Sequence, residues 1–189
     1  PWARGPSFPW RPGGRCCPWS PSRDRRSEAK AKHKAHIFGS GCLMMSALRA
    51  QEMLAEKWDV AADVWSVTSF TALRRNGIEM ERWNRLHPTE EPRASYVEEM
   101  LGDRGGPVVA ATDYMRAFAD GIRAWVPGRY EVLGTDGFGR SDYRVRLRRF
   151  FEVDRHHVAV AALSSLAREG AIDAAIPAAA ITRYDIDPE

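Results

Sequence analysis

Short apolar runs alternate with stretches of helical periodicity from residue 34 to the end of the chain, and this alternation constrains the fold more than any other feature. The run at residues 60–67 is apolar on both faces, as a strand covered by helices on each side must be. Strands and helices in alternation build a mostly parallel sheet with helices packed against it. The sequence therefore predicts an α/β fold, a three-layer sandwich, with strands near residues 35–39, 60–67, 107–112 and 130–135.

Between and after these runs, apolar residues recur at the spacing that places them on one face of a helix. In the first such stretch they include Leu43, Ala47 and Leu54. The pair Asn76 and Gly77 is expected to bend or break the second helix. The predicted helices lie at residues 42–58, 70–86, 95–101, 114–126, 142–153, 156–170 and 174–186.

The first 31 residues differ in composition from the rest of the chain. Residues 1–34 hold nine Lys and Arg against two acidic residues, whereas residues 35–189 hold nineteen against twenty-three. Six of the twelve prolines also lie at the start, where they oppose both helices and central strands. We therefore predict one domain at residues 32–189. Residues 1–31 are either a disordered arm or a leader that is not native coding sequence.

Several classes of protein are excluded by what the sequence lacks. Three cysteines, of which Cys16 and Cys17 are adjacent, do not form a disulfide framework, and Cys42 is predicted to be a small buried residue. A reduced, cytoplasmic setting fits this usage best. No apolar run approaches the roughly 20 residues of a membrane span. No basic face interleaved with aromatic residues predicts nucleic-acid binding.

The stretch VLGTDGFGRSD at residues 132–142 places three glycines around Asp136, in a loop that follows the last predicted strand. Its glycine spacing is not that of a dinucleotide-binding fingerprint, and the lysine of a P-loop is absent. A strand-to-helix turn is favoured, with Ser141 as the N-cap and Asp142 in the first helical turn. Ligand binding stays an alternative, because loops at the carboxyl ends of parallel strands also bind ligands. The structural or interface candidates are Asp136, Gly137, Phe138, Gly139, Arg140 and Ser141.

The histidines do not form a recognisable site. His87 precedes a proline and has no nucleophile motif near it in sequence. His156 and His157 are adjacent and should point to different faces of a helix, and His33 and His36 lack partnering cysteines. We therefore predict no catalytic and no metal-binding residue.

Two further groups of side chains are expected on a surface or at an interface. Arg144, Arg148 and Arg149 should share one side of a helix, as a solvated face or as a docking surface for an acidic partner. Apolar residues of that segment are left for the core, namely Leu147, Phe150 and Phe151. Large rings are expected to anchor packing or an interface at Trp65, Trp83 and Trp125.

Five longer stretches together resemble the C-terminal domain of the homodimeric bacterial pyruvate dehydrogenases, which belong to the transketolase-like superfamily. The resemblance covers about residues 32–189, with departures at Tyr143, Cys42 and Asn76. The stretches lie at residues 60–67, 81–88, 106–115, 132–142 and 147–154.

The resemblance implies a role for this domain within a larger enzyme. Such an enzyme decarboxylates pyruvate with thiamine diphosphate and Mg²⁺ and then reductively acetylates a lipoyl group of the dihydrolipoyl acetyltransferase component. The family's diphosphate site uses a Gly-Asp-Gly motif followed by an asparagine, but no such motif precedes Asn76 or Asn84 here. The chain alone is therefore expected to bind neither thiamine diphosphate nor Mg²⁺ and to be inactive. The family architecture also implies a fifth strand.

As the dimerisation and scaffold domain of such an enzyme, the chain should bind its other domains and a second copy. The predicted interface side chains are Trp65, Phe70, Trp83, Tyr114 and Phe138, with Asp136 and Arg140 nearby. The alternative is a stand-alone module that binds an anionic metabolite through the loop at residues 134–142.

Overall fold

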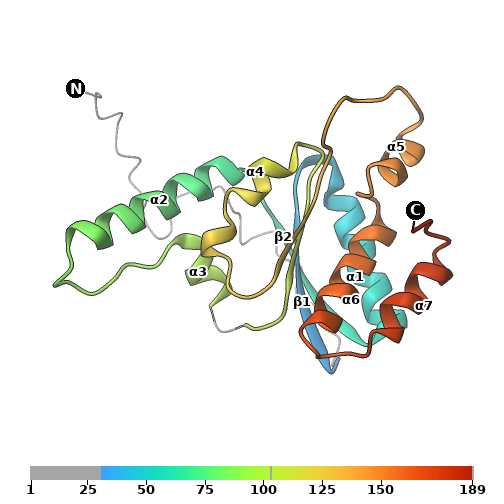
Figure 1. The fold of residues 1–189 in the computed structure, drawn as a ribbon, viewed down its shortest axis with the longest axis horizontal. Helices are drawn as coiled ribbons and strands as arrows, with labels where there is room; N and C mark the ends of the chain where they lie inside the picture. Colours follow the sequence, from blue (N-terminus) through green and yellow to red (C-terminus); the bar gives the residue numbers. More distant parts are fainter. Residues whose placement is uncertain (1–30, 103, 189) are drawn as a thin grey trace.

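The computed structural model describes residues 31–102 and 104–188 of the chain. Within them, four parallel strands form one sheet in the order β2-β1-β3-β4 (Figure 1). The predicted leader at residues 1–31 lies outside the described residues, except for its last residue. The strands are β1 (His33–Gly39), β2 (Val60–Ser66), β3 (Val108–Ala111) and β4 (Tyr130–Leu133).

The central strand β1 sets the register of the whole sheet. It pairs along its full length with β2, and its last four residues pair with β3. Gly39 is aligned with Ser66 on one side and with Ala111 on the other, and Ala111 is aligned with Leu133. Because these four residues each end a strand, the loops that follow all four strands leave the sheet at one edge.

Helices cover both faces of the sheet, which confirms the predicted three-layer sandwich (Figure 1). Side chains alternate along β1, so that Ile37 packs toward one layer and Phe38 toward the other. The Ile37 side is covered by α1 (Met44–Trp58), α6 (Arg155–Arg168) and α7 (Ala175–Arg183). The Phe38 side is covered by α2 (Phe70–Leu86), α3 (Tyr96–Leu101), α4 (Arg116–Asp120) and the 3-10 helix η3 (Arg123–Trp125).

Some predicted elements differ from the observed ones. The single helix predicted at residues 114–126 is two short pieces, α4 and η3, with Gly121 and Ile122 between them. Conversely, α2 runs without a break through Asn76 and Gly77, which were expected to interrupt it. A short 3-10 helix η2 (Gly41–Leu43) precedes α1, and α5 (Arg144–Phe150) is shorter than predicted. The expected fifth strand is not found in the described part of the chain. None of the described helices is both long and apolar enough to cross a membrane.

Two contacts explain why α2 continues through residues that normally disfavour helices. The Asn76 Oδ1 atom accepts a hydrogen bond from the backbone amide of Tyr96 at 2.7 Å, which joins α2 to α3. The ring of Trp125 lies directly against the backbone at Gly77, where a Cβ atom would be 2.3 Å from the ring carbon Cδ2. Glycine is therefore required at this position by the close approach of the ring and not by backbone flexibility.

Replacing Gly77 with alanine should lower the free energy of unfolding by about 1–3 kcal/mol, the usual cost of overpacking. At an open helical position the same change would instead raise stability by up to about 1 kcal/mol. A loss of stability in urea unfolding would therefore indicate the contact with Trp125, whereas a gain would indicate an open position. Gly139→Ala is the control and should be nearly neutral, because no heavy atom lies within 4 Å of the added methyl group. A Gly77→Ala protein as stable as wild type would contradict the packing.

His36 is a polar residue buried in the central strand. Its Nε2 atom lies 3.0 Å from the carbonyl oxygen of Gly105, and Trp65 Nε1 donates to its Nδ1 atom at 3.3 Å. Both contacts are satisfied by the neutral ring with its proton on Nε2. Burial lowers the pKa of His36, and the nearby Asp63 carboxylate only partly offsets this effect.

Stability should therefore decrease as the pH falls below about 6.5, because the unfolded chain takes up a proton that buried His36 resists. The loss should continue until the pH reaches the lowered pKa of the folded state. Urea unfolding of wild type and His36→Gln, compared between about pH 8 and about pH 5, isolates this contribution. His36→Gln should lose less stability than wild type when the pH is lowered. Parallel pH profiles would show that His36 does not titrate in this way.

Candidate functional site

The carboxyl edge of the sheet brings four loops together, because the strands end in register there. Backbone hydrogen bonds continue past the strand ends, and Val67 N donates to Gly39 O at 2.9 Å. Between the loops after β3 and β4, Thr135 N donates to Tyr114 O at 2.9 Å. These bonds hold the loops as one platform at the edge where open α/β sheets bind their ligands and partners.

Asp136 fastens the β4 loop to the start of α4. Its Oδ1 atom accepts a hydrogen bond from the backbone amide of Arg116 at 3.0 Å, and its Oδ2 atom lies 3.6 Å from Arg116 Nε. Gly134 approaches the same segment closely, since a Cβ atom there would lie 2.8 Å from the carbonyl oxygen of Tyr114. The carboxylate of Asp136 therefore binds its own chain and holds two loops in place.

The helix after this loop begins later than the sequence predicts. Tyr143 occupies the N-cap position of α5, and no side-chain hydrogen bond caps the helix. Ser141 is therefore not the N-cap. Asp142 also precedes the helix, and its Oδ1 atom accepts a hydrogen bond from Tyr143 N at 2.6 Å. The predicted N-cap at Ser141 and the predicted place of Asp142 in the first turn are both wrong, because the chain remains extended at Tyr143 and turns only after it.

Large apolar side chains are exposed around this edge. Phe138, at the tip of the β4 loop, is 98% exposed, and α5 has no buried residue. Phe150 is therefore exposed and not in the core as predicted, whereas Phe151 packs against the core. We define the apolar edge surface as the eight exposed side chains of Met45, Tyr114, Met115, Phe118, Phe138, Tyr143, Val145 and Phe150.

Only part of the predicted aromatic interface belongs to this surface. Tyr114 and Phe138 are exposed as expected, but Trp65 and Phe70 are 1% and 4% exposed and lie in the core. Trp83 is half-buried and held by its neighbours: its ring stacks on His87 at 4.4 Å, and the Arg93 guanidinium lies 3.6 Å from its centroid. Sequence reasoning missed Phe118 and Met115, which are exposed and lie in the segment predicted as a single helix.

A cavity of about 300 Å³ opens beside the apolar edge surface, between the loops after β1, β3 and β4. Cys42 lines this cavity and is exposed, which corrects the prediction that it is buried. Its thiol donates to the Asp113 Oδ2 atom at 3.3 Å, and Arg148 of α5 donates to its carbonyl oxygen at 3.0 Å. Within the described residues, no three His, Cys, Asp or Glu side chains are grouped as a metal site requires. The polar groups here bond to one another and fix the loops and α5.

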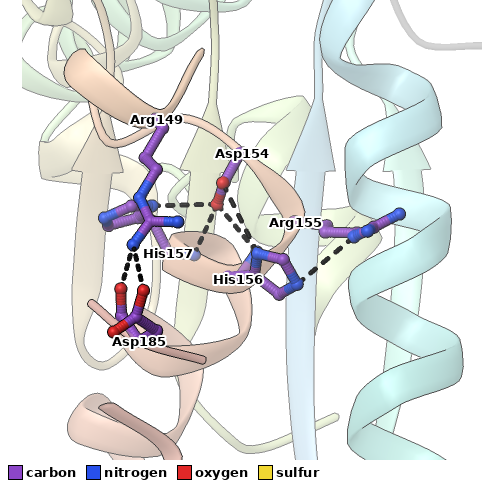
Figure 2. A network of polar contacts seen from close by, with 6 residues as sticks. All are labelled: Arg149, Asp154, Arg155, His156, His157 and Asp185. Atoms are coloured by element: carbon purple, nitrogen blue, oxygen red, sulfur yellow. Dashed lines mark hydrogen bonds and ion pairs between the residues drawn. The ribbon is translucent and has the colours of Figure 1, made fainter. Parts of the chain in front are cut away.

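A second polar network lies at the start of α6 (Figure 2). The Asp154 Oδ1 atom accepts hydrogen bonds from the backbone amides of His156 and His157, at 2.9 and 3.0 Å, and lies 2.8 Å from His157 Nδ1. His156 Nδ1 lies 3.5 Å from the other carboxylate oxygen. Both rings therefore meet one carboxylate, although the sequence predicts that they point to different helix faces. Beside this network, Arg149 reaches from α5 to Asp185 after α7 (Figure 2).

The Asp154 carboxylate and the histidines beside it influence one another's pKa values. Burial raises the pKa of Asp154, but the hydrogen bonds from His157 and the nearby His156 outweigh burial and lower that pKa to about 2. Burial lowers the pKa of His156, which its carboxylate neighbour opposes. The arrangement is that of a charged N-cap that stabilises the first turn of α6.

Comparison with known proteins places this fold in a family. Residues 25–154 match the model of the transketolase-like C-terminal domain. The chain belongs to this transketolase-like family. It is 55% identical over 161 residues to the pyruvate dehydrogenase E1 component of Pseudomonas aeruginosa, covering 85% of this chain and 18% of that protein. For the same component of Escherichia coli K12, identity is 49% over 160 residues, covering 84% and 18%. A Pichia stipitis transketolase structure shares the fold with a TM-score of 0.50 and 18% identity, over 78% of this chain and 18% of that one.

The resemblance to bacterial pyruvate dehydrogenases inferred from the sequence is thus confirmed, and the chain spans 18% of the length of these relatives. The part that matches the transketolase-like domain includes all four strands and the loops of the carboxyl edge, and it ends at Asp154. Helices α6 and α7 follow it, and Val158, Leu163 and Ala180 from them complete the core on the α1 side. Asp154 therefore caps the first of the two helices that complete the layer begun by α1.

Replacing Asp154 with alanine should lower the free energy of unfolding at neutral pH by about 1–2 kcal/mol, because α6 loses its cap. In the wild-type protein this contribution should be present above about pH 4 and be lost as the pH falls toward 2, since folding lowers the carboxyl pKa to about 2. Urea unfolding at several pH values measures both effects. Asp173→Ala serves as the control, because this carboxylate also accepts a backbone amide, from Ala175 at 2.7 Å, but is exposed. Equal losses in the two variants would contradict the special role of Asp154.

Proposed function

We propose that this chain is the C-terminal dimerisation and scaffold domain of a pyruvate dehydrogenase, and that the apolar edge surface binds the other domains and the second copy of that enzyme. One observation carries the proposal. Of the ten exposed large apolar side chains in the described residues, eight belong to the apolar edge surface. Obligate interfaces are large and apolar at their centre, which suits such a gathering of exposed apolar side chains.

Two contacts hold parts of the apolar edge surface in place before any partner binds. Asp136 holds the loop that carries Phe138 against Arg116 at the start of α4, the helix that carries Phe118. Arg140 lies over the ring of Phe150, with its guanidinium 4.1 Å from the ring centroid. Contacts that fix side chains in advance reduce the entropy lost on association, so this arrangement favours protein binding. In this proposal residues 136–141 hold the interface in shape and perform no chemistry.

The chemistry then belongs to the whole enzyme, which would be cytoplasmic. Decarboxylation of pyruvate and acetylation of a lipoyl group on the dihydrolipoyl acetyltransferase component would need thiamine diphosphate and Mg²⁺, held by domains outside this chain. The length of the relatives supports this view, since this chain corresponds to 18% of each. The absence of a Gly-Asp-Gly motif before either asparagine supports it as well. We infer that the isolated chain has no catalytic activity.

The alternative, a module that binds an anionic metabolite through the loop at residues 134–142, has less support. The Asp136 carboxylate in this loop would repel an anion, and it is already bound to Arg116. Arg140 is the cation of the loop itself, and it is engaged with Phe150. Arg140 also does not line the cavity beside the loop.

The chain should self-associate as its concentration rises, because the apolar edge surface lacks its partners in isolation. Sedimentation velocity over an about hundredfold concentration range measures this directly. The double variant Phe118→Ser and Phe138→Ser should weaken association about tenfold or more, since each buried phenylalanine contributes roughly 1.5–3 kcal/mol.

The matched control is the double variant Ile78→Ser and Leu86→Ser, which removes the two exposed apolar side chains of α2. It should associate as wild type does. The proposal fails if the wild-type chain is monomeric throughout, or if the control variant dissociates as much as the edge variant.

A further inference from the structure

A cavity of about 280 Å³ lies where α1, α6 and α7 meet. Four side chains that are positively charged at neutral pH line it: Arg49, Lys57, Arg155 and Arg183. They come from three different helices, so no single stretch of sequence reveals the cluster. Only two carboxylates, those of Glu52 and Glu56, line the same cavity.

Among the described residues, the side chains that line the cavity carry a net positive charge, since four cations face two carboxylates. Arg49 pairs with Glu52 at 2.7 Å. Among residues 31–102 and 104–188, no carboxylate oxygen lies within 4.0 Å of a charged nitrogen of Lys57, Arg155 or Arg183. Like charges around a concavity repel one another and focus a positive potential into it. An anion bound in the cavity would relieve this repulsion.

The wall of the cavity is held in place by contacts within the protein itself. Tyr184 is fixed by a hydrogen bond from Trp58 Nε1 to its hydroxyl at 2.8 Å. The ring of His156 stacks on Tyr184 at 4.9 Å, and its Nδ1 atom lies 3.5 Å from the Asp154 carboxylate. Arg155 Nε then lies 3.4 Å from His156 Nε2, so that the arginine extends from α6 toward α1 (Figure 2). The cationic side chains therefore stand around a rigid aromatic wall.

We propose that this cavity binds a small phosphate-bearing anion through Arg155, Arg183 and Lys57. Guanidinium groups match phosphate oxygens in a bidentate fork, and an ammonium group adds a point charge. The volume is near the lower end of ligand pockets, about 300 Å³, which suits a small ligand. None of the residues belongs to the apolar edge surface, so the inference does not depend on the proposed scaffold role.

Isothermal titration calorimetry with sodium pyrophosphate and with inorganic phosphate tests the proposal, using the full chain and sodium chloride at matched ionic strength as the reference. Saturable binding to one site is expected, together with an increase in the thermal unfolding midpoint. The double variant Arg155→Gln and Arg183→Gln should weaken binding about tenfold or more, because two charge-assisted hydrogen bonds are lost. Lys57→Gln should weaken it by a smaller factor, and it provides a second measurement if the double variant does not fold.

The control is the double variant Arg75→Gln and Arg168→Gln, which removes the same net charge from exposed positions that do not line the cavity. It should bind as wild type does. The proposal is overturned if wild type shows no saturable binding, if the control loses as much affinity as the cavity variant, or if Lys57→Gln binds as wild type. Competition by a glutamate-rich peptide that binds the cavity more tightly than pyrophosphate would instead assign it to protein docking.

Discussion

The in-register parallel pairing of β1 with its two neighbours is the constraint on which the rest of this structure depends. β1 lies between β2 and β3, and its alternating side chains Ile37 and Phe38 supply both hydrophobic cores. The same pairing makes all four strands end at one edge of the sheet. Two layers of helices and a single platform of loops follow from that geometry, since parallel strands require crossovers that return the chain to the same starting edge.

Several polar side chains of this protein serve to hold the chain together. Asp136, Asp154 and Asn76 each direct a side-chain oxygen to backbone amides, of Arg116, of His156 and His157, and of Tyr96 respectively. In each case the bond joins elements or begins a helix. Buried or half-buried polar groups need such partners, and backbone amides at helix starts and in loops supply them. An aspartate in a glycine-rich loop is therefore weak evidence for chemistry.

The domain presents two surfaces of different character. The apolar edge surface gathers exposed rings at the loops, and its polar neighbours are bonded to one another. The cavity between α1, α6 and α7 instead gathers four cations, of which only Arg49 is paired with a carboxylate in the described chain. The first resembles the centre of a protein interface and the second resembles an anion site, since burial of apolar area and neutralisation of charge are separate driving forces. One small domain thus presents both, on different groups of helices.

The sequence by itself determined the four strands, the helical layers and the family, because periodicity and motifs are local properties that survive without tertiary information. It also located the loop at residues 132–142 as the feature that links the last strand to the next helix. Tertiary structure decided which individual side chains are exposed: Cys42 and Phe150 lie outside the core, and Trp65 and Phe70 lie inside it. It also decided that α2 continues through Gly77, that Ser141 caps nothing, and that Arg49, Lys57, Arg155 and Arg183 meet. These outcomes depend on contacts between segments far apart in the chain, and such contacts have no signature in the residues of either segment alone.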